Sequence, residues 1–68
     1  MSVSYKKLWK LLIDRGYNKT TLRTAGIHPT TIAKMGRDEY VTMDVLDKIC
    51  DILDCDYGDI IEHIKDSE

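Results

Sequence analysis

Basic and hydroxyl side chains alternate with apolar ones in the stretch RTAGIHPTTIAKMGRDEY, residues 23–40. Gly26 marks a helix break, and Pro29 suits the first turn of a following helix because its missing N–H has no intrahelical partner there. Helical spacing leaves Lys34 outward, where an ammonium group can donate hydrogen bonds to an acceptor. The stretch is therefore either a helical hairpin that only packs or one that lays its second helix into a groove of DNA.

Enzyme and metal chemistry have little support elsewhere in the chain. The sequence has no paired carboxylates, nucleophile–base pair or phosphate loop in a plausible setting, so we expect no catalytic activity and no cofactor. His28, His63, Cys50 and Cys55 are the residues that zinc would use, but their spacing matches no zinc motif and places them on different elements. We expect no metal site.

The charge of the chain is strongly asymmetric. Residues 1–37 carry eight basic residues against Asp14 alone, whereas residues 38–68 carry two basic residues against eleven acidic ones. The overall charge of -2 hides this division. Such asymmetry indicates either a basic face that meets a polyanion, with an acidic end turned away from it, or two solvated surfaces that differ in charge.

Length and composition bound the class of protein. The 68 residues, of which 43% are hydrophobic and 32% charged, predict a single globular domain spanning 1–68. A chain of this size buries only about 60% of its unfolded surface, which leaves little room for an enclosed pocket. No membrane span or secretory signal is present, so we expect a cytoplasmic protein with reduced thiols.

Helical periodicity runs through almost the whole chain, and the strand signal is nearly absent. We expect five short helices and no sheet. The first runs over residues 5–15 after the N-cap Ser4 and ends at Gly16, and the second opens at Asn18 or Lys19 and stops at Gly26. The third runs from Pro29 to about Met35 and ends at Gly36, and the fourth follows the N-cap Thr42. The fifth follows the N-cap Asp56, with Asp59 completing a weak capping box.

The apolar side chains on these helices predict the core. The expected inward residues are Tyr5, Leu8, Trp9, Leu12, Ile13, Leu22, Ala25, Ile27, Ile32, Met35, Val45, Leu46, Ile49, Cys50 and Leu53. Ile60, Ile61 and Ile64 either complete the core of the monomer or form a surface for self-association.

The ordered pattern resembles the Cro/CI-type helix-turn-helix family, also called XRE-like or lambda-repressor-like. The residues that carry the resemblance are LLIDRG, TLRTAGIHPTTIAKMGRDE and VTMDVLDKICDILDCDYGDII, which together cover nearly the whole chain. The resemblance implies an all-α, compact five-helix domain whose second and third helices form the helix-turn-helix. Three places depart from the family pattern: Thr21 followed by Leu22 before Gly26, His28 where Ser is common, and Pro29 where a polar residue is common.

The resemblance also implies which side chains contact DNA. The base-reading positions fall on Pro29, Thr30 and Lys34; the phosphate-contacting positions fall on Asn18, Lys19, Thr20, Thr21, His28, Arg37 and Tyr40. Lysine can donate to guanine, threonine can bond a base edge or pack on a thymine methyl, and proline can only pack. For each basic residue, the alternative is a solvated side chain with no partner.

Two functions follow from this reading. The first is a sequence-specific DNA-binding transcriptional regulator, acting as a repressor on double-stranded DNA, which often requires a homodimer. The second is a protein-binding module, such as an antitoxin-like or anti-repressor subunit, that keeps the fold without specific DNA binding. The overall acidity of the chain and Pro29 favour the second. We expect no small-molecule ligand and no membrane partner.

Overall fold

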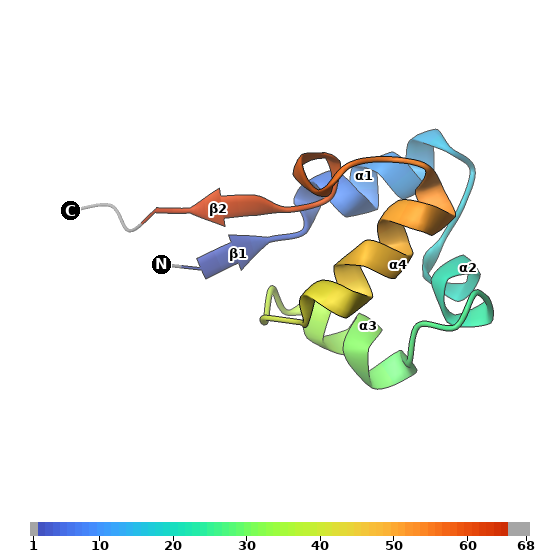
Figure 1. Ribbon diagram of the computed structural model, residues 1–68, viewed down its shortest axis with the longest axis horizontal. Helices are drawn as coiled ribbons and strands as arrows, with labels where there is room; N and C mark the ends of the chain where they lie inside the picture. Colours follow the sequence, from blue (N-terminus) through green and yellow to red (C-terminus); the bar gives the residue numbers. More distant parts are fainter. Residues whose placement is uncertain (1, 66–68) are drawn as a thin grey trace.

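The computed structural model describes residues 2–65, in which helices dominate and a two-stranded sheet pairs the first and last segments (Figure 1). The elements are β1 (Ser2–Ser4), α1 (Lys6–Asp14), α2 (Lys19–Thr24), α3 (Pro29–Gly36), α4 (Met43–Leu53), the 3-10 turn η1 (Tyr57–Asp59) and β2 (Glu62–Ile64). The prediction of five helices is therefore wrong in its last member. Four α-helices form the helical body, and the expected fifth is replaced by η1 and β2.

The two strands pair although they lie at opposite ends of the described sequence. They are antiparallel, with Ser2 opposite Ile64 and Ser4 opposite Glu62. Figure 1 shows this pair of strands extending away from the helical body. The expected cap at Asp56 is confirmed, because its carboxylate accepts from the N–H of Tyr57 and the Asp59 side chain completes the capping box. However, this cap starts a single turn rather than a helix.

All four α-helices end in the same hydrogen-bond pattern. After each helix one residue has a positive φ, namely Gly16 at 74°, Gly26 at 114°, Asp38 at 57° and Asp54 at 52°. The N–H of the next residue then donates to the carbonyl five residues earlier, as in a Schellman motif, over 2.8 to 3.1 Å. These motifs satisfy carbonyl groups that the helices leave unpaired and turn the chain sharply, so the connections stay short.

The predicted end of α3 at Gly36 is confirmed, because Gly36 is the last residue of the helix. Gly36 has no positive φ, however, and the left-handed position belongs to Asp38. Aspartate tolerates this conformation better than most side chains. Its carboxylate also accepts from the N–H of Tyr5, with 3.2 Å between nitrogen and oxygen. The end of α3 is therefore fixed partly by the start of α1.

Tyr5 reinforces this junction from inside the core. Its side chain is buried, and its hydroxyl donates to the carbonyl of Glu39 over 2.7 Å. Burial, with the nearby charge of Asp38, raises the pKa of the tyrosine hydroxyl, so the group stays a hydrogen-bond donor. Tyr5 also occupies the N-cap position of α1 that was predicted for Ser4, which belongs to β1.

The core lies where the helices and η1 converge. Its buried members are Tyr5, Leu8, Leu12, Leu22, Ile27, Ile32, Met35, Leu46, Ile49, Leu53 and Ile60. Two predictions of inward residues need correction, because Ile13 is 75% exposed and Ala25 is exposed. Trp9 is half-buried and packs against the core. Val45 and Cys50 are also half-buried.

The three isoleucines predicted for self-association have different environments. Ile60 is fully buried and completes the core of the monomer, so it offers no surface to a partner. Ile61 is half-buried, and Ile64 on β2 is 39% exposed. Of the three, Ile64 alone presents a substantially exposed side chain, and it lies on β2 rather than on a helix.

Candidate nucleic-acid interface

The start of α2 is fixed by a reciprocal cap. The side chain of Asn18 accepts from the N–H of Thr21 over 3.1 Å, and the Thr21 hydroxyl accepts from the N–H of Asn18 over 3.3 Å. This capping box holds Lys19 and Thr20 in the first turn of α2. Asn18 and Thr21, both predicted to contact phosphate, thus have a structural role that is visible without any ligand.

Removal of this cap is expected to destabilise the protein measurably. Asn18→Ala leaves the N–H of Thr21 without its acceptor and should lower the free energy of unfolding by about 1 kcal/mol. Denaturant unfolding followed by circular dichroism measures the change. Asn18→Asp keeps the acceptor and should stay close to the wild type. An equal loss in both variants would contradict a capping role.

The turn between α2 and α3 follows the sequence prediction closely. Gly26 takes the left-handed position, Ile27 is buried in the core, and Pro29 is the first residue of α3. His28 is the N-cap, and its Nδ1 accepts from the N–H of Thr30 over 3.1 Å. Because Nδ1 accepts, the proton of the neutral ring lies on Nε2, which remains a hydrogen-bond donor at an exposed position.

The helix α3 has one buried and one exposed face. Ile32 and Met35 are buried and hold the helix against the core. The exposed side chains of Pro29, Thr30, Ala33 and Lys34 lie on one face at helical spacing, and the exposed C-cap Arg37 follows them. The structure therefore brings together all three residues predicted to read bases. It adds Ala33, whose methyl group is suited to contact a thymine methyl; its position, four residues after Pro29, was the available signal.

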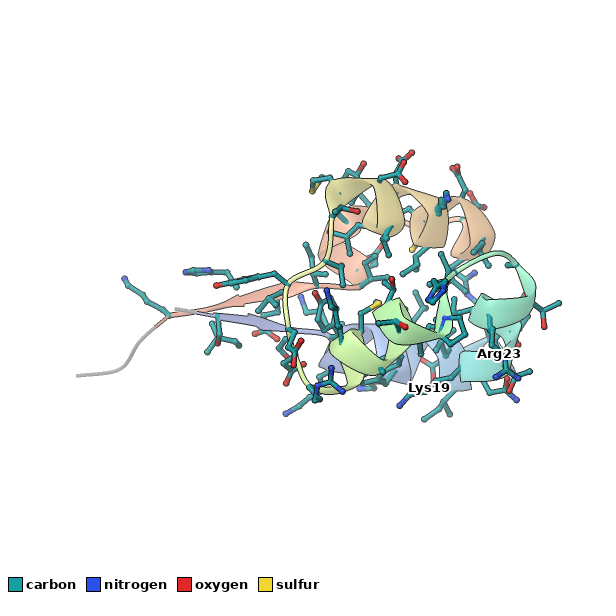
Figure 2. All side chains as sticks on the ribbon, turned by 90° about the horizontal axis from the view of Figure 1, so that it is seen from below. Lys19 and Arg23 are labelled. Atoms are coloured by element: carbon teal, nitrogen blue, oxygen red, sulfur yellow. The ribbon has the colours of Figure 1, made fainter. Side chains whose placement is uncertain are left out.

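A shallow hollow lies between α2 and α3. Its lining contains Lys19, Thr20 and Arg23 from α2, with Pro29, Ile32 and Ala33 from α3. Figure 2 shows the labelled Lys19 and Arg23 on α2 next to α3. Arg23 was not among the predicted contacts. The signal was its spacing, because four residues after Lys19 is the same face of a helix.

The loop after α3 carries the remaining predicted contacts, Arg37 and Tyr40. The Arg37 guanidinium and the Glu39 carboxylate form an ion pair with 2.7 Å between Nε and Oε2. The hydrogen bond from Arg37 lowers the pKa of the Glu39 carboxyl group and raises that of the guanidinium. Tyr40 is 70% exposed and lines a second small hollow with Thr31 and Lys34. The positive charge at this end of α3 is therefore partly neutralised.

The basic half of the sequence does not form one basic face. Lys7 and Lys10 line a hollow with the acidic side chains of Asp54 and Asp59, on the side formed by α1 and the end of α4. The Lys7 ammonium donates to the carbonyl of Gly58 over 3.3 Å. These lysines face carboxylates, whereas the cations of α2 and α3 gather around the hollow and the exposed face of α3.

The two cysteines lie side by side at the end of α4. Both are free and half-buried, and the N–H of Cys55 donates to the carbonyl of Cys50 over 3.1 Å. Burial raises the pKa of the Cys50 thiol to about 11, so it is protonated at neutral pH. Among residues 2–65, no three histidine, cysteine or acidic side chains are placed to hold a metal ion. Within the same span, no helix is long and apolar enough to cross a membrane.

Comparisons with known proteins agree with this geometry. The model of the Cro/C1-type HTH DNA-binding domain family matches residues 7–66. A crystal structure of the transcriptional regulator VanUg has a TM-score of 0.90 and 52% sequence identity, covering 96% of this chain and 88% of that one. The search of curated proteins gave no match.

Proposed function

The chain belongs to the Cro/C1-type helix-turn-helix DNA-binding family, and on this premise we propose that it is a sequence-specific transcriptional regulator that places α3 in the major groove. The observation that carries the proposal is the exposed face of α3, where Thr30, Ala33 and Lys34 lie together. A helix fits the major groove, and these side chains supply a donor, a hydroxyl and a methyl group for base edges. The likeness to VanUg, a transcriptional regulator, supports the same function.

Phosphate contacts flank α3 on both sides in this proposal. Lys19, Thr20 and Arg23 line the hollow between α2 and α3, with the Lys19 ammonium next to Gly36, and Arg37 with Tyr40 follows the end of α3. The start of α2 adds free N–H groups that attract a phosphate, with Asn18 and Thr21 at the cap. At the turn, the Nε2–H of His28 is a further donor. Such contacts set the position of the domain on the duplex, while α3 reads the sequence.

We further propose that the protein acts as a repressor, because a bound domain blocks other proteins simply by occupying its site. The proposal places it in the cytoplasm with the DNA that it reads. One short helix reads few base pairs, so two copies on a two-fold site would increase specificity. In such a pair, the exposed Ile64 would place the contact between the two copies on β2.

Selection of bound duplexes from a random pool tests the proposal directly. We expect enrichment of a defined site, and a two-fold repeat in that site would show that two copies bind. Binding to the enriched duplex should weaken as salt increases, because phosphate contacts release counterions. A pool that shows no enrichment, with no duplex bound at low salt, would contradict the proposed function.

The ion pair at the end of α3 predicts a variant that binds more tightly. Glu39→Gln releases the Arg37 guanidinium for a phosphate and should raise affinity for the enriched duplex about two- to fivefold. Fluorescence anisotropy measures the change. Glu62→Gln makes the same charge change on β2 and should have a smaller effect. Equal gains in both variants would show that net charge, and not this ion pair, controls binding.

The acidic side of the molecule supports the second candidate function, a protein-binding module. The carboxylates of Asp44, Asp47, Asp51 and Asp54 are exposed along α4. This surface would attract a basic protein partner. Pull-down from native cell extract with and without nuclease separates the two candidates. A partner retained after nuclease treatment, together with no duplex binding at low salt, would favour the module.

A further inference from the structure

One cation connects the three helices nearest the proposed interface. The Lys19 ammonium on α2 lies 4.7 Å from the centre of the Trp9 ring on α1. It also lies next to Gly36 at the end of α3, where a Cβ atom would be 3.7 Å from Nζ, an ordinary van der Waals contact. Gly36 has an ordinary helical φ, so no backbone strain requires glycine there. The ammonium therefore lies within van der Waals reach of the end of α3 as well as over the ring.

The surroundings of Lys19 differ from those of Arg37 in a way that matters for phosphate binding. Arg37 is paired with Glu39, so its charge is partly neutralised. No carboxylate of residues 2–65 forms an ion pair with Lys19. The Trp9 ring attracts the ammonium through its quadrupole and carries no net charge. The cation is therefore held in place while its full positive charge remains available to a phosphate.

We propose that Trp9 is a positioning residue for DNA binding, whose ring holds the Lys19 ammonium at the edge of the hollow between α2 and α3, ready for a backbone phosphate. The proposal rests on the proposed DNA-binding function. A free lysine side chain loses rotational freedom when it contacts a phosphate, and a side chain ordered beforehand loses less. Trp9 is half-buried against the core, so the ring is itself a fixed support.

A double-mutant cycle tests the coupling between Trp9 and Lys19. The four proteins are the wild type, Trp9→Leu, Lys19→Gln and the double variant, each titrated into a labelled duplex of arbitrary sequence at low salt. We expect Lys19→Gln and Trp9→Leu each to weaken binding, the latter by about two- to fivefold. In the Lys19→Gln background, Trp9→Leu should have no further effect. A loss of the same size in both backgrounds would overturn the proposal.

Stability and side-chain chemistry are controlled in the same series. Thermal unfolding of each variant shows whether Trp9→Leu keeps the fold at the temperature of the titration. Trp9→Phe retains an aromatic face and should recover most of the lost affinity if Lys19 is present. If Trp9→Phe binds as weakly as Trp9→Leu while both remain folded, an aromatic face has no role and the proposal is wrong.

Tryptophan fluorescence provides an independent readout, because Trp9 is the one tryptophan in the chain. Lys19→Gln should change the emission of the free protein by removing the cation from the ring, and duplex should change the emission of the wild type. Unchanged emission in Lys19→Gln would overturn the contact itself. If the wild type binds no duplex, the proposed function fails as well; if it binds but the cycle is additive, the positioning role fails alone.

Discussion

Leu22→Ala is expected to remove a large part of the stability of the fold. Leu22 is the one buried residue of α2 within the described chain, and it is fully enclosed in the core. Truncation of such a side chain costs about 2–5 kcal/mol, whereas a chain of this length has a total stability of roughly 3–10 kcal/mol. Thermal and denaturant unfolding followed by circular dichroism should show a midpoint lowered by roughly 10–30 °C.

The matched control truncates another residue that helical periodicity predicts to be inward. Ile13 falls on the predicted apolar stripe of α1, yet its side chain is 75% exposed. Ile13→Ala should therefore change the free energy of unfolding by less than about 0.5 kcal/mol. A loss comparable with that of Leu22→Ala would place Ile13 in the core and contradict the observed packing of α1.

Local chemistry explains why the turn between α2 and α3 could be predicted. Gly26 supplies a positive φ, Ile27 follows it into the core, and Pro29 starts the next helix. Each of these preferences acts within a few residues, so sequence spacing contains the required information. The fully buried Leu22 and Met35 on the flanking helices were predicted for the same reason.

The pairing of β1 with β2 could not be predicted because it does not depend on local sequence. β1 and β2 have three residues each and lie at the two ends of the described sequence. Strands this short carry no clear alternation of polar and apolar residues, and their pairing depends on the helical body bringing both ends together. Ile60 and Ile64 have helical spacing in the sequence, but the first completes the core and the second joins β2.

The candidate interface shows a similar division between local and tertiary information. The exposed face of α3 follows from helical spacing, so the positions of Thr30 and Lys34 could be predicted. The surroundings of Lys19 and Lys10 could not be predicted, because they come from other elements. Lys19 meets Trp9 of α1, and Lys10 lies with Asp54 and Asp59. The charge of the first half of the chain therefore overstates the basic surface around α3.

Lys34→Ala is expected to cause the largest loss of DNA binding among single substitutions on α3. Lys34 is an exposed cation on the same helix face as Thr30 and Ala33, and in the proposed complex its ammonium group would reach base edges. Loss of a base contact of this kind costs about 1–3 kcal/mol, so affinity for the enriched duplex should fall about 5- to 150-fold. Anisotropy titrations at fixed salt measure this change.

The pattern of the loss distinguishes a base contact from a phosphate contact at Lys34. If Lys34 reads a base, Lys34→Ala should also relax the preference at one position of the enriched site in a repeated selection. A uniform loss across sequences, with the slope of log affinity against log salt reduced by about one, would instead assign Lys34 to a phosphate. Lys10→Ala is the control with the same charge change. Lys10 lines a hollow with carboxylates at the end of α4, so Lys10→Ala should bind the enriched duplex with nearly the affinity of the wild type. An equal loss in both variants would mean that overall charge, and not the face of α3, determines binding.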